Sequence, residues 1–167
     1  TVQDTDGDGL LDGAEVNTHG TDPSLSDTEG DGLHDGFEVQ YGFNPLVGGE
    51  QSQDPDGDDL TNFNEQDFGT NPIRADTDGD RLDDGAELNE AGTNPLVTDT
   101  DTDGMGDGFE FVNGFDPLFL DQDFDLVPDG QADWDNDGLS NAEEELVWAN
   151  PDNPDTIALV SDQGAII

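Results

Sequence analysis

The chain has 167 residues, of which 44 are Asp or Glu and only 2 are Lys or Arg, so its formal net charge is −42. Hydrophobic residues make up 30%, and 22 Gly and 9 Pro favour turns over a buried core. A conventional enzyme with a large apolar core is therefore not expected. The negative field repels nucleic acid and anionic lipid, which excludes both as direct partners, and attracts cations.

There are no cysteines, which excludes disulfides and thiolate metal sites. No apolar run is long enough to span a membrane, so no membrane insertion is expected. The start at Thr1, without Met and without an export signal, suggests a mature protein or an excised segment.

Acidic runs of the type Asp-Thr-Asp-Gly-Asp-Gly recur along the chain, mostly at intervals of about 22 residues, as expected for a repeat array. A second motif, Gly-(Thr/Phe)-(Asp/Asn)-Pro, has the same period, and residues 47–53 form a Gly/Gln/Ser-rich insertion. The runs, called loops 1 to 7 below, begin at Asp4, Asp27, Asp54, Asp76, Asp99, Asp121 and Asp133.

The spacing within each loop fits a hard dication such as Ca²⁺, which takes six to eight oxygen ligands. A tight loop can present them from positions 1, 3 and 5, the backbone carbonyl of position 7, position 9, and a bidentate Glu at position 12. The sequence predicts six complete loops and thus six or seven Ca²⁺ sites, with further shared sites open. The predicted ligands are Asp4, Asp6, Asp8, Leu10, Asp12 and Glu15; Asp27, Glu29, Asp31, Leu33, Asp35 and Glu38; Asp54, Asp56, Asp58, Leu60, Asn62 and Glu65; Asp76, Asp78, Asp80, Leu82, Asp84 and Glu87; Asp99, Asp101, Asp103, Met105, Asp107 and Glu110; and Asp133, Asp135, Asp137, Leu139, Asn141 and Glu144.

Loop 6 is degenerate: it keeps Asp121, Asp123, Asp125 and Asp129 but has Ala132 in place of the closing Glu. It is expected to be a weaker site or one completed by a neighbouring segment. Position 6, at the sharp turn, is usually Gly, which tolerates a left-handed backbone. Loop 4 has Arg81 there, so this loop is expected to bend differently.

A solvated halophilic surface or a disordered acidic tail is the alternative explanation for so much acid. However, 32 of the 44 acidic residues occupy coordinating positions, which a surface under selection for solubility alone would not favour. The carboxylates would repel one another without metal, so metal binding and folding are expected to be one event. Helix-breaking Gly20 and Pro23 leave no room between loops for the entering helix of an EF-hand.

The two motifs together resemble the thrombospondin type 3 repeat in its cysteine-free bacterial form, over about residues 4–155. The resemblance implies an extracellular, bacterial array in which the chain wraps around a row of Ca²⁺ ions. It also implies that the residue before Pro can contribute a ligand, which adds Asp22, Asn71, Asn94 and Asp116 as further candidates.

The sequence thus predicts an irregular, elongated, metal-stabilised array over residues 1–155, with short helical turns after each loop and a minimal hydrophobic core. Residues 156–167 are expected to form an apolar strand that caps the array, begins a following domain or pairs with another chain. The predicted function is a non-enzymatic, Ca²⁺-rigidified spacer of a surface or secreted protein. The alternatives are a self-assembling fibre or matrix subunit with contacts between copies and, less favoured, a dockerin-like recruitment module.

Overall fold

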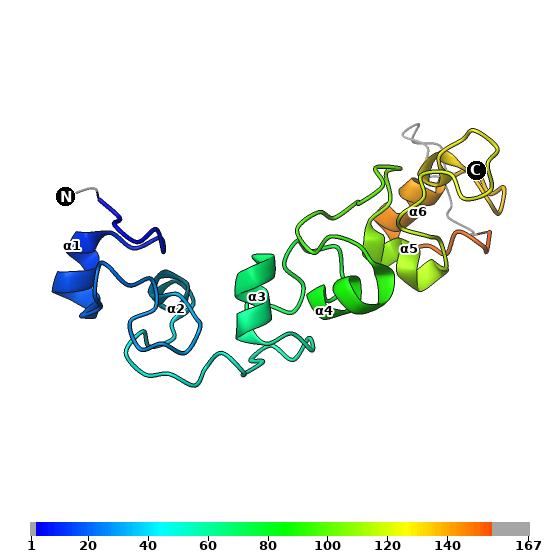
Figure 1. Cartoon of the computed structure of the whole chain (residues 1–167). Coiled ribbons are helices and arrows are strands. Elements are labelled where there is room, and N and C mark those ends of the chain that lie inside the picture. The colour runs from blue at the N-terminus through cyan, green and yellow to red at the C-terminus, as the bar shows by residue number, and fades with distance from the viewer. Residues whose placement is uncertain (1–2, 155–167) are drawn as a thin grey trace, which may run out of the picture. The chain divides into compact units, whose positions relative to one another are not determined.

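The computed structural model describes residues 3–154, and their fold is a succession of short helices joined by irregular loops (Figure 1). No residue in this range belongs to a β-strand, as predicted for an irregular array. The predicted strand at 156–167 lies outside the described residues. None of the helices in the described part is long and apolar enough to cross a membrane.

The chain divides into two compact units, Thr1–Thr98 and Asp99–Ile167. The first contains α1 (Asp12–Ala14), which continues into the π-helix η1 (Glu15–His19), then α2 (Asp35–Tyr41), α3 (Asn62–Phe68), and α4 (Asp84–Ala86) with the π-helix η2 (Glu87–Ala91). The second contains α5 (Asp107–Asn113), the 3₁₀-helix η3 (Asp129–Gln131) and α6 (Asn141–Val147). Each loop therefore ends in a helical turn, and in six of the seven loops the helical segment continues past position 12, as predicted.

The helices begin and end where the repeat places specific residues. Each α-helix starts at position 9 of its loop, directly after a residue with an extended backbone, as in α2 after His34. Five of the helical segments end at a Gly in the left-handed region, which caps the helix because it needs no Cβ. These are Gly20, Gly42, Gly69, Gly92 and Gly114, the first residues of the Gly-(Thr/Phe)-(Asp/Asn)-Pro motif. The second repeat motif is thus a helix terminator.

Apolar packing is sparse, as predicted. The buried hydrophobic side chains are Leu33, Leu60, Leu82, Met105, Phe109 and Phe115. One cluster joins Met105, Phe109 and Phe115 with Ala142 of α6 in the second unit. The buried groups are instead dominated by carboxylates, because all six Glu residues at position 12 are fully buried. A fold with this interior needs a source of positive charge.

Candidate metal centres

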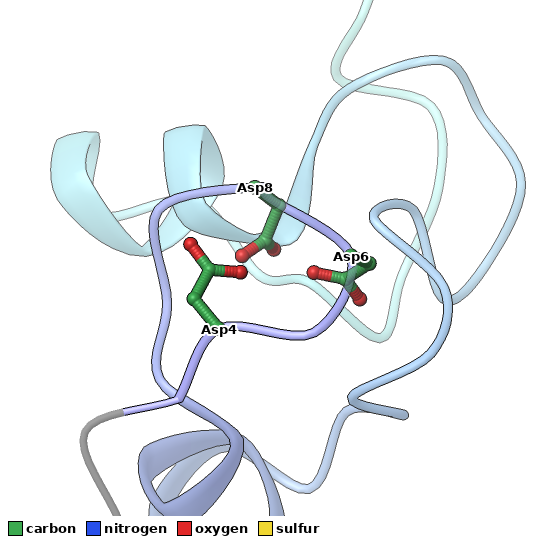
Figure 2. Close-up of side chains that lie close together, drawn as sticks. All are labelled: Asp4, Asp6 and Asp8. Atoms are coloured by element: carbon green, nitrogen blue, oxygen red, sulfur yellow. The ribbon is translucent and has the colours of Figure 1, made fainter.

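Position 1 of each loop ties the loop into a ring through its carboxylate. In loop 1, Asp4 accepts hydrogen bonds from the backbone N–H of Gly7 at 2.8 Å and of Gly9 at 3.3 Å. Figure 2 shows the result: Asp4, Asp6 and Asp8 point their carboxylates toward the middle of the ring. One oxygen from each lies within 4.8 Å of the others. The same grouping occurs in loop 3 for Asp54, Asp56 and Asp58.

Position 5 follows one rule in all seven loops: its Oδ1 accepts the N–H of position 7, which holds the carboxylate in place while leaving Oδ2 for another partner. The distances lie between 2.7 and 2.9 Å, and the acceptors are Asp8, Asp31, Asp58, Asp80, Asp103, Asp125 and Asp137. The side chain of position 7 itself is fully or partly buried in the six complete loops. This position therefore carries the small apolar interior as well as the predicted carbonyl ligand.

Position 6 has a left-handed backbone in every loop, whether or not it is Gly. Arg81 has φ 80° and donates its N–H to Asp76 at 3.1 Å, which is the bond that Gly9 makes to Asp4 in loop 1. The expectation that loop 4 bends differently is therefore wrong. The hydrogen bonds of the ring fix this φ and override the steric preference of the side chain.

The position-12 carboxylates are completely buried, as are the position-9 carboxylates of Asp35, Asp84 and Asp107. Glu38 and Glu110 are 0% exposed, and neither oxygen of either side chain receives a hydrogen bond. Glu15, Glu65 and Glu87 are also 0% exposed; each has one oxygen bound by a Thr hydroxyl and the other without a donor. Buried polar groups are normally satisfied, so these oxygens point to an additional partner.

The raised pKa values of these Glu side chains also indicate that an additional partner is needed. Burial, followed by repulsion from the neighbouring Asp and Glu side chains, raises the pKa of Glu38 from about 4.5 to about 9 and that of Glu110 to about 10. The same two causes raise the pKa of Glu15 to about 7 and of Glu65 to about 8. For Glu87, burial and neighbouring Asp residues raise the pKa to about 8 against the lowering effect of the Thr93 hydroxyl. A dication among these carboxylates would reverse the effect.

Position 9 joins one loop to the next, which the spacing within a loop did not reveal. Asp35 of loop 2 accepts two bonds from Thr28 of its own loop, at 2.9 Å from N and 2.7 Å from Oγ1. It also lies within a 4.8 Å group with Asp8 and Glu15 of loop 1. Asp84 of loop 4 forms the corresponding group with Asp58 and Glu65 of loop 3. Positions 5 and 12 of one loop and position 9 of the next therefore form a junction group.

The junction depends on a glycine at position 10. The N–H of Gly36 donates to Oδ2 of Asp8 at 3.0 Å, and a Cβ at Gly36 would overlap the Asp8 carbonyl. A Cβ at Gly85 would overlap the Asp58 carbonyl in the same way. Gly130 repeats the contact on Asp103, with an N–H to Oδ2 distance of 2.7 Å. The Gly at position 10, which follows the position-9 Asp in loops 1, 2, 4, 5 and 6 but not the position-9 Asn in loops 3 and 7, is the sequence signal that could have predicted the junction.

The remaining predicted ligands behave differently. In loop 6, Asp121, Asp123 and Asp125 are all at least partly exposed, and none has a buried oxygen that lacks a donor. The candidates before Pro act as turn caps: Oδ1 of each accepts the N–H two residues later, in Asp22, Asn71, Asn94 and Asp116. Their role as ligands stays a prediction.

These donor sets fit a hard cation. They consist of carboxylate oxygens fixed by backbone N–H groups, and their unpaired buried oxygens are the kind of ligand that Ca²⁺ takes in numbers of six to eight. The chain itself offers only two basic side chains, Arg74 and Arg81, for the whole array. The chain's own cations therefore cannot balance these carboxylates, which leaves protonation or a bound cation to neutralise them.

The family comparison agrees with this architecture. The family described as "Bacterial TSP3 repeat" matches residues 4–26, 27–48, 76–98 and 133–146. The chain contains bacterial TSP3 repeats. The matched segments of this TSP3 array include all of loops 1, 2, 4 and 7, and each begins at the position-1 Asp.

Two solved structures are similar over a small part of the TSP3 array. A "Biofilm associated protein - B domain" is 50% identical over 28% of this chain and 12% of its own, with a TM-score of 0.27. A "Biofilm associated protein - BSP domain" is 51% identical over 28% of this chain and 8% of its own, also with a TM-score of 0.27. The array thus spans only a small fraction of either chain. No curated protein matches it significantly.

Proposed function

We propose that the TSP3 array is a Ca²⁺-binding structural module that stiffens when it is loaded and serves as a spacer in an extracellular surface or secreted protein. One observation carries the proposal: the position-12 Glu side chains are completely buried among other acids, and oxygens of five of them receive no hydrogen bond from the described residues. Burying an unpaired carboxylate is so costly that such a group normally neutralises or binds a cation.

Two kinds of ion position follow from the geometry. The loop position uses the carboxylates of positions 1, 3 and 5, as in Asp4, Asp6 and Asp8. The junction position uses positions 5 and 12 with position 9 of the next loop, as in Asp8, Glu15 and Asp35. Because Asp8 belongs to both groups, the two ions would share a ligand and bind cooperatively. More than six ions per chain are therefore expected.

The mechanical role follows from the sparse apolar interior. Few hydrophobic side chains are buried in residues 3–154, so ion binding would supply much of the free energy that orders the loops. Without Ca²⁺ the chain should be expanded and sensitive to proteases. Ca²⁺ at extracellular concentrations should order each loop and each junction and thereby limit bending between repeats. Nothing in this arrangement calls for catalysis, which favours a structural role.

The test is a calorimetric titration of the chelator-stripped chain with Ca²⁺, combined with small-angle scattering at each step. Six or more ions should bind while the radius of gyration falls below the roughly 43 Å of an unfolded chain of this length, and it should stay above the roughly 15 Å of a compact globule. Mg²⁺ is the control, because it retains its waters and fits poorly into all-protein cages. Two or fewer Ca²⁺ ions with no change in dimensions would refute the proposal. Growth into polymers at the same Ca²⁺ concentration would favour the fibre alternative.

A further inference from the structure

The insertion at residues 47–53 lies against the acidic groups of loop 2. Gly49 donates its N–H to Oδ2 of Asp31 at 2.7 Å. A Cβ at Gly48 would lie 2.9 Å from the Asp31 Cβ and 3.5 Å from the Glu29 Cγ, so only Gly allows this approach. Gly49 thus donates to a position-5 carboxylate as Gly36 does at the first junction, but from the residue before Glu50, whereas Gly36 follows its position-9 acid.

The end of the insertion has the hydrogen-bond register of a loop end. Asn62 donates its Nδ2 to the carbonyl of Glu50 at 2.9 Å and its N–H to the carbonyl of Gln53 at 2.8 Å. In the second unit, Asn141 donates its Nδ2 to the carbonyl of Asp129 at 2.7 Å and its N–H to that of Ala132 at 2.8 Å. Both side-chain bonds span 12 residues. Glu50 therefore stands where loop 6 has Asp129, which is position 9.

The junction that follows loop 2 lacks the position-9 carboxylate that completes the first and third junctions. At the first and third junctions the following loop supplies Asp35 and Asp84. The loop after loop 2 has Asn62 at position 9, whose Nδ2 is bound to the insertion and whose Oδ1 is buried without a hydrogen-bond donor, so loop 3 offers an amide oxygen here but no carboxylate. Loop 2 nevertheless contains Glu38, which is 0% exposed with neither oxygen receiving a hydrogen bond. Glu38 therefore points to a bound cation for which position 9 of loop 3 supplies no charge.

The insertion has oxygens available for it. Oε2 of Glu50 is buried and has no hydrogen-bond partner among the described residues, although the surrounding segment is largely exposed. Oε1 of Gln51 is also buried and has no hydrogen-bond partner among the described residues. Two consecutive side chains with buried, unpaired oxygens beside a group of acids resemble a set of cation ligands, since solvated surface groups would not be buried.

We propose that residues 47–53 replace a missing repeat and that Glu50 supplies the junction carboxylate for a divalent, oxygen-preferring cation held with Asp31 and Glu38. The inference rests on the proposed function. The row of junctions then continues across the insertion. Glu has one methylene more than Asp, and this longer side chain lets residue 50 reach the ion from the backbone of the insertion.

The experiment is a Ca²⁺ titration by calorimetry of the full chain carrying Glu50→Gln, next to the wild type. The control is Glu90→Gln, which removes the same charge from an exposed residue of η2. Glu50→Gln should lose one ion from the stoichiometry, or bind one ion at least tenfold more weakly, while Glu90→Gln binds like the wild type. Glu50→Asp, which keeps the charge and shortens the side chain, should fall between the two.

The outcomes separate this inference from the proposed function. A wild type that binds no Ca²⁺ overturns both. A wild type with its full number of ions and a Glu50→Gln variant indistinguishable from Glu90→Gln overturns only the role of Glu50. Circular dichroism in saturating Ca²⁺ monitors folding, and if Glu50→Gln does not fold, the decision passes to Glu50→Asp: a wild-type titration of that variant likewise overturns the role of Glu50.

Discussion

Replacing Gly36 by Ala should break the junction between loops 1 and 2. The new Cβ would overlap the Asp8 carbonyl, and relieving the overlap must pull the Gly36 N–H away from Oδ2 of Asp8, now 3.0 Å distant. Overpacking costs about 1 to 3 kcal/mol, and a hydrogen bond to a charged acceptor contributes about 1.5 to 3 kcal/mol. Ala returns about 1 kcal/mol through its higher helix propensity. The Ca²⁺-loaded protein should therefore lose about 1.5 to 5 kcal/mol of unfolding free energy.

The chain offers a matched control in Gly13→Ala. Gly13 is also at position 10 and in a helix, α1, but nothing lies within 4 Å of its Cβ position. This variant should gain about 0.5 to 1 kcal/mol from helix propensity alone. Urea unfolding of both variants in saturating Ca²⁺, followed by circular dichroism, measures the difference. Equal stability of the two variants would show that the junction does not form.

Two further predictions concern loop 6 and pH. Leu126 has φ 77° and is 91% exposed, so Leu126→Gly should remove backbone strain without loss of packing. The substitution should stabilise the Ca²⁺-loaded protein by about 1 kcal/mol in the same urea assay. A destabilised variant would contradict this prediction. Burial and neighbouring acids raise the pKa of Glu38 to about 9 and of Glu110 to about 10 in the fold, so the metal-free fold loses stability as the pH rises from about 4.5 through these values. At pH 7 the metal-free chain should therefore be unfolded with its carboxylates already ionised, and Ca²⁺ binding should release almost no protons when titrated in two buffers of different ionisation enthalpy. Release of several protons would mean that the metal-free chain keeps the fold.

Much of each repeat could be predicted from the sequence because it is local. The ring of a loop closes through hydrogen bonds between residues a few positions apart, such as Gly7 and Asp4. Such short spacings can be recognised in the amino-acid sequence. The helix after each loop and the lack of a large apolar core were predicted for the same reason. The Gly-Thr-Asp-Pro motif was expected to break helices at Gly20 and Pro23, and the structure confirms that η1 ends at Gly20.

The Arg81 prediction failed because it weighed one residue against its own backbone preference. The ring around Asp76 forms several hydrogen bonds at once, including those from Gly79 at 2.6 Å and Arg81 at 3.1 Å. Together these bonds outweigh the penalty of a left-handed Arg, which is of order 1 to 2 kcal/mol. The steric preference of Arg alone therefore predicted the wrong backbone conformation at this position.

The sequence by itself determined which residues carry the acid, where each loop turns and where each helix ends, because these depend on contacts within about 12 residues. Only the tertiary structure decided which acids meet across loops. Asp8 and Gly36 are 28 residues apart, and Asp31 and Gly49 are 18 apart, so no spacing rule within a loop relates them. The junctions, and the place of Glu50 in one of them, depend on how closely one backbone can approach the next, which the folded chain alone defines.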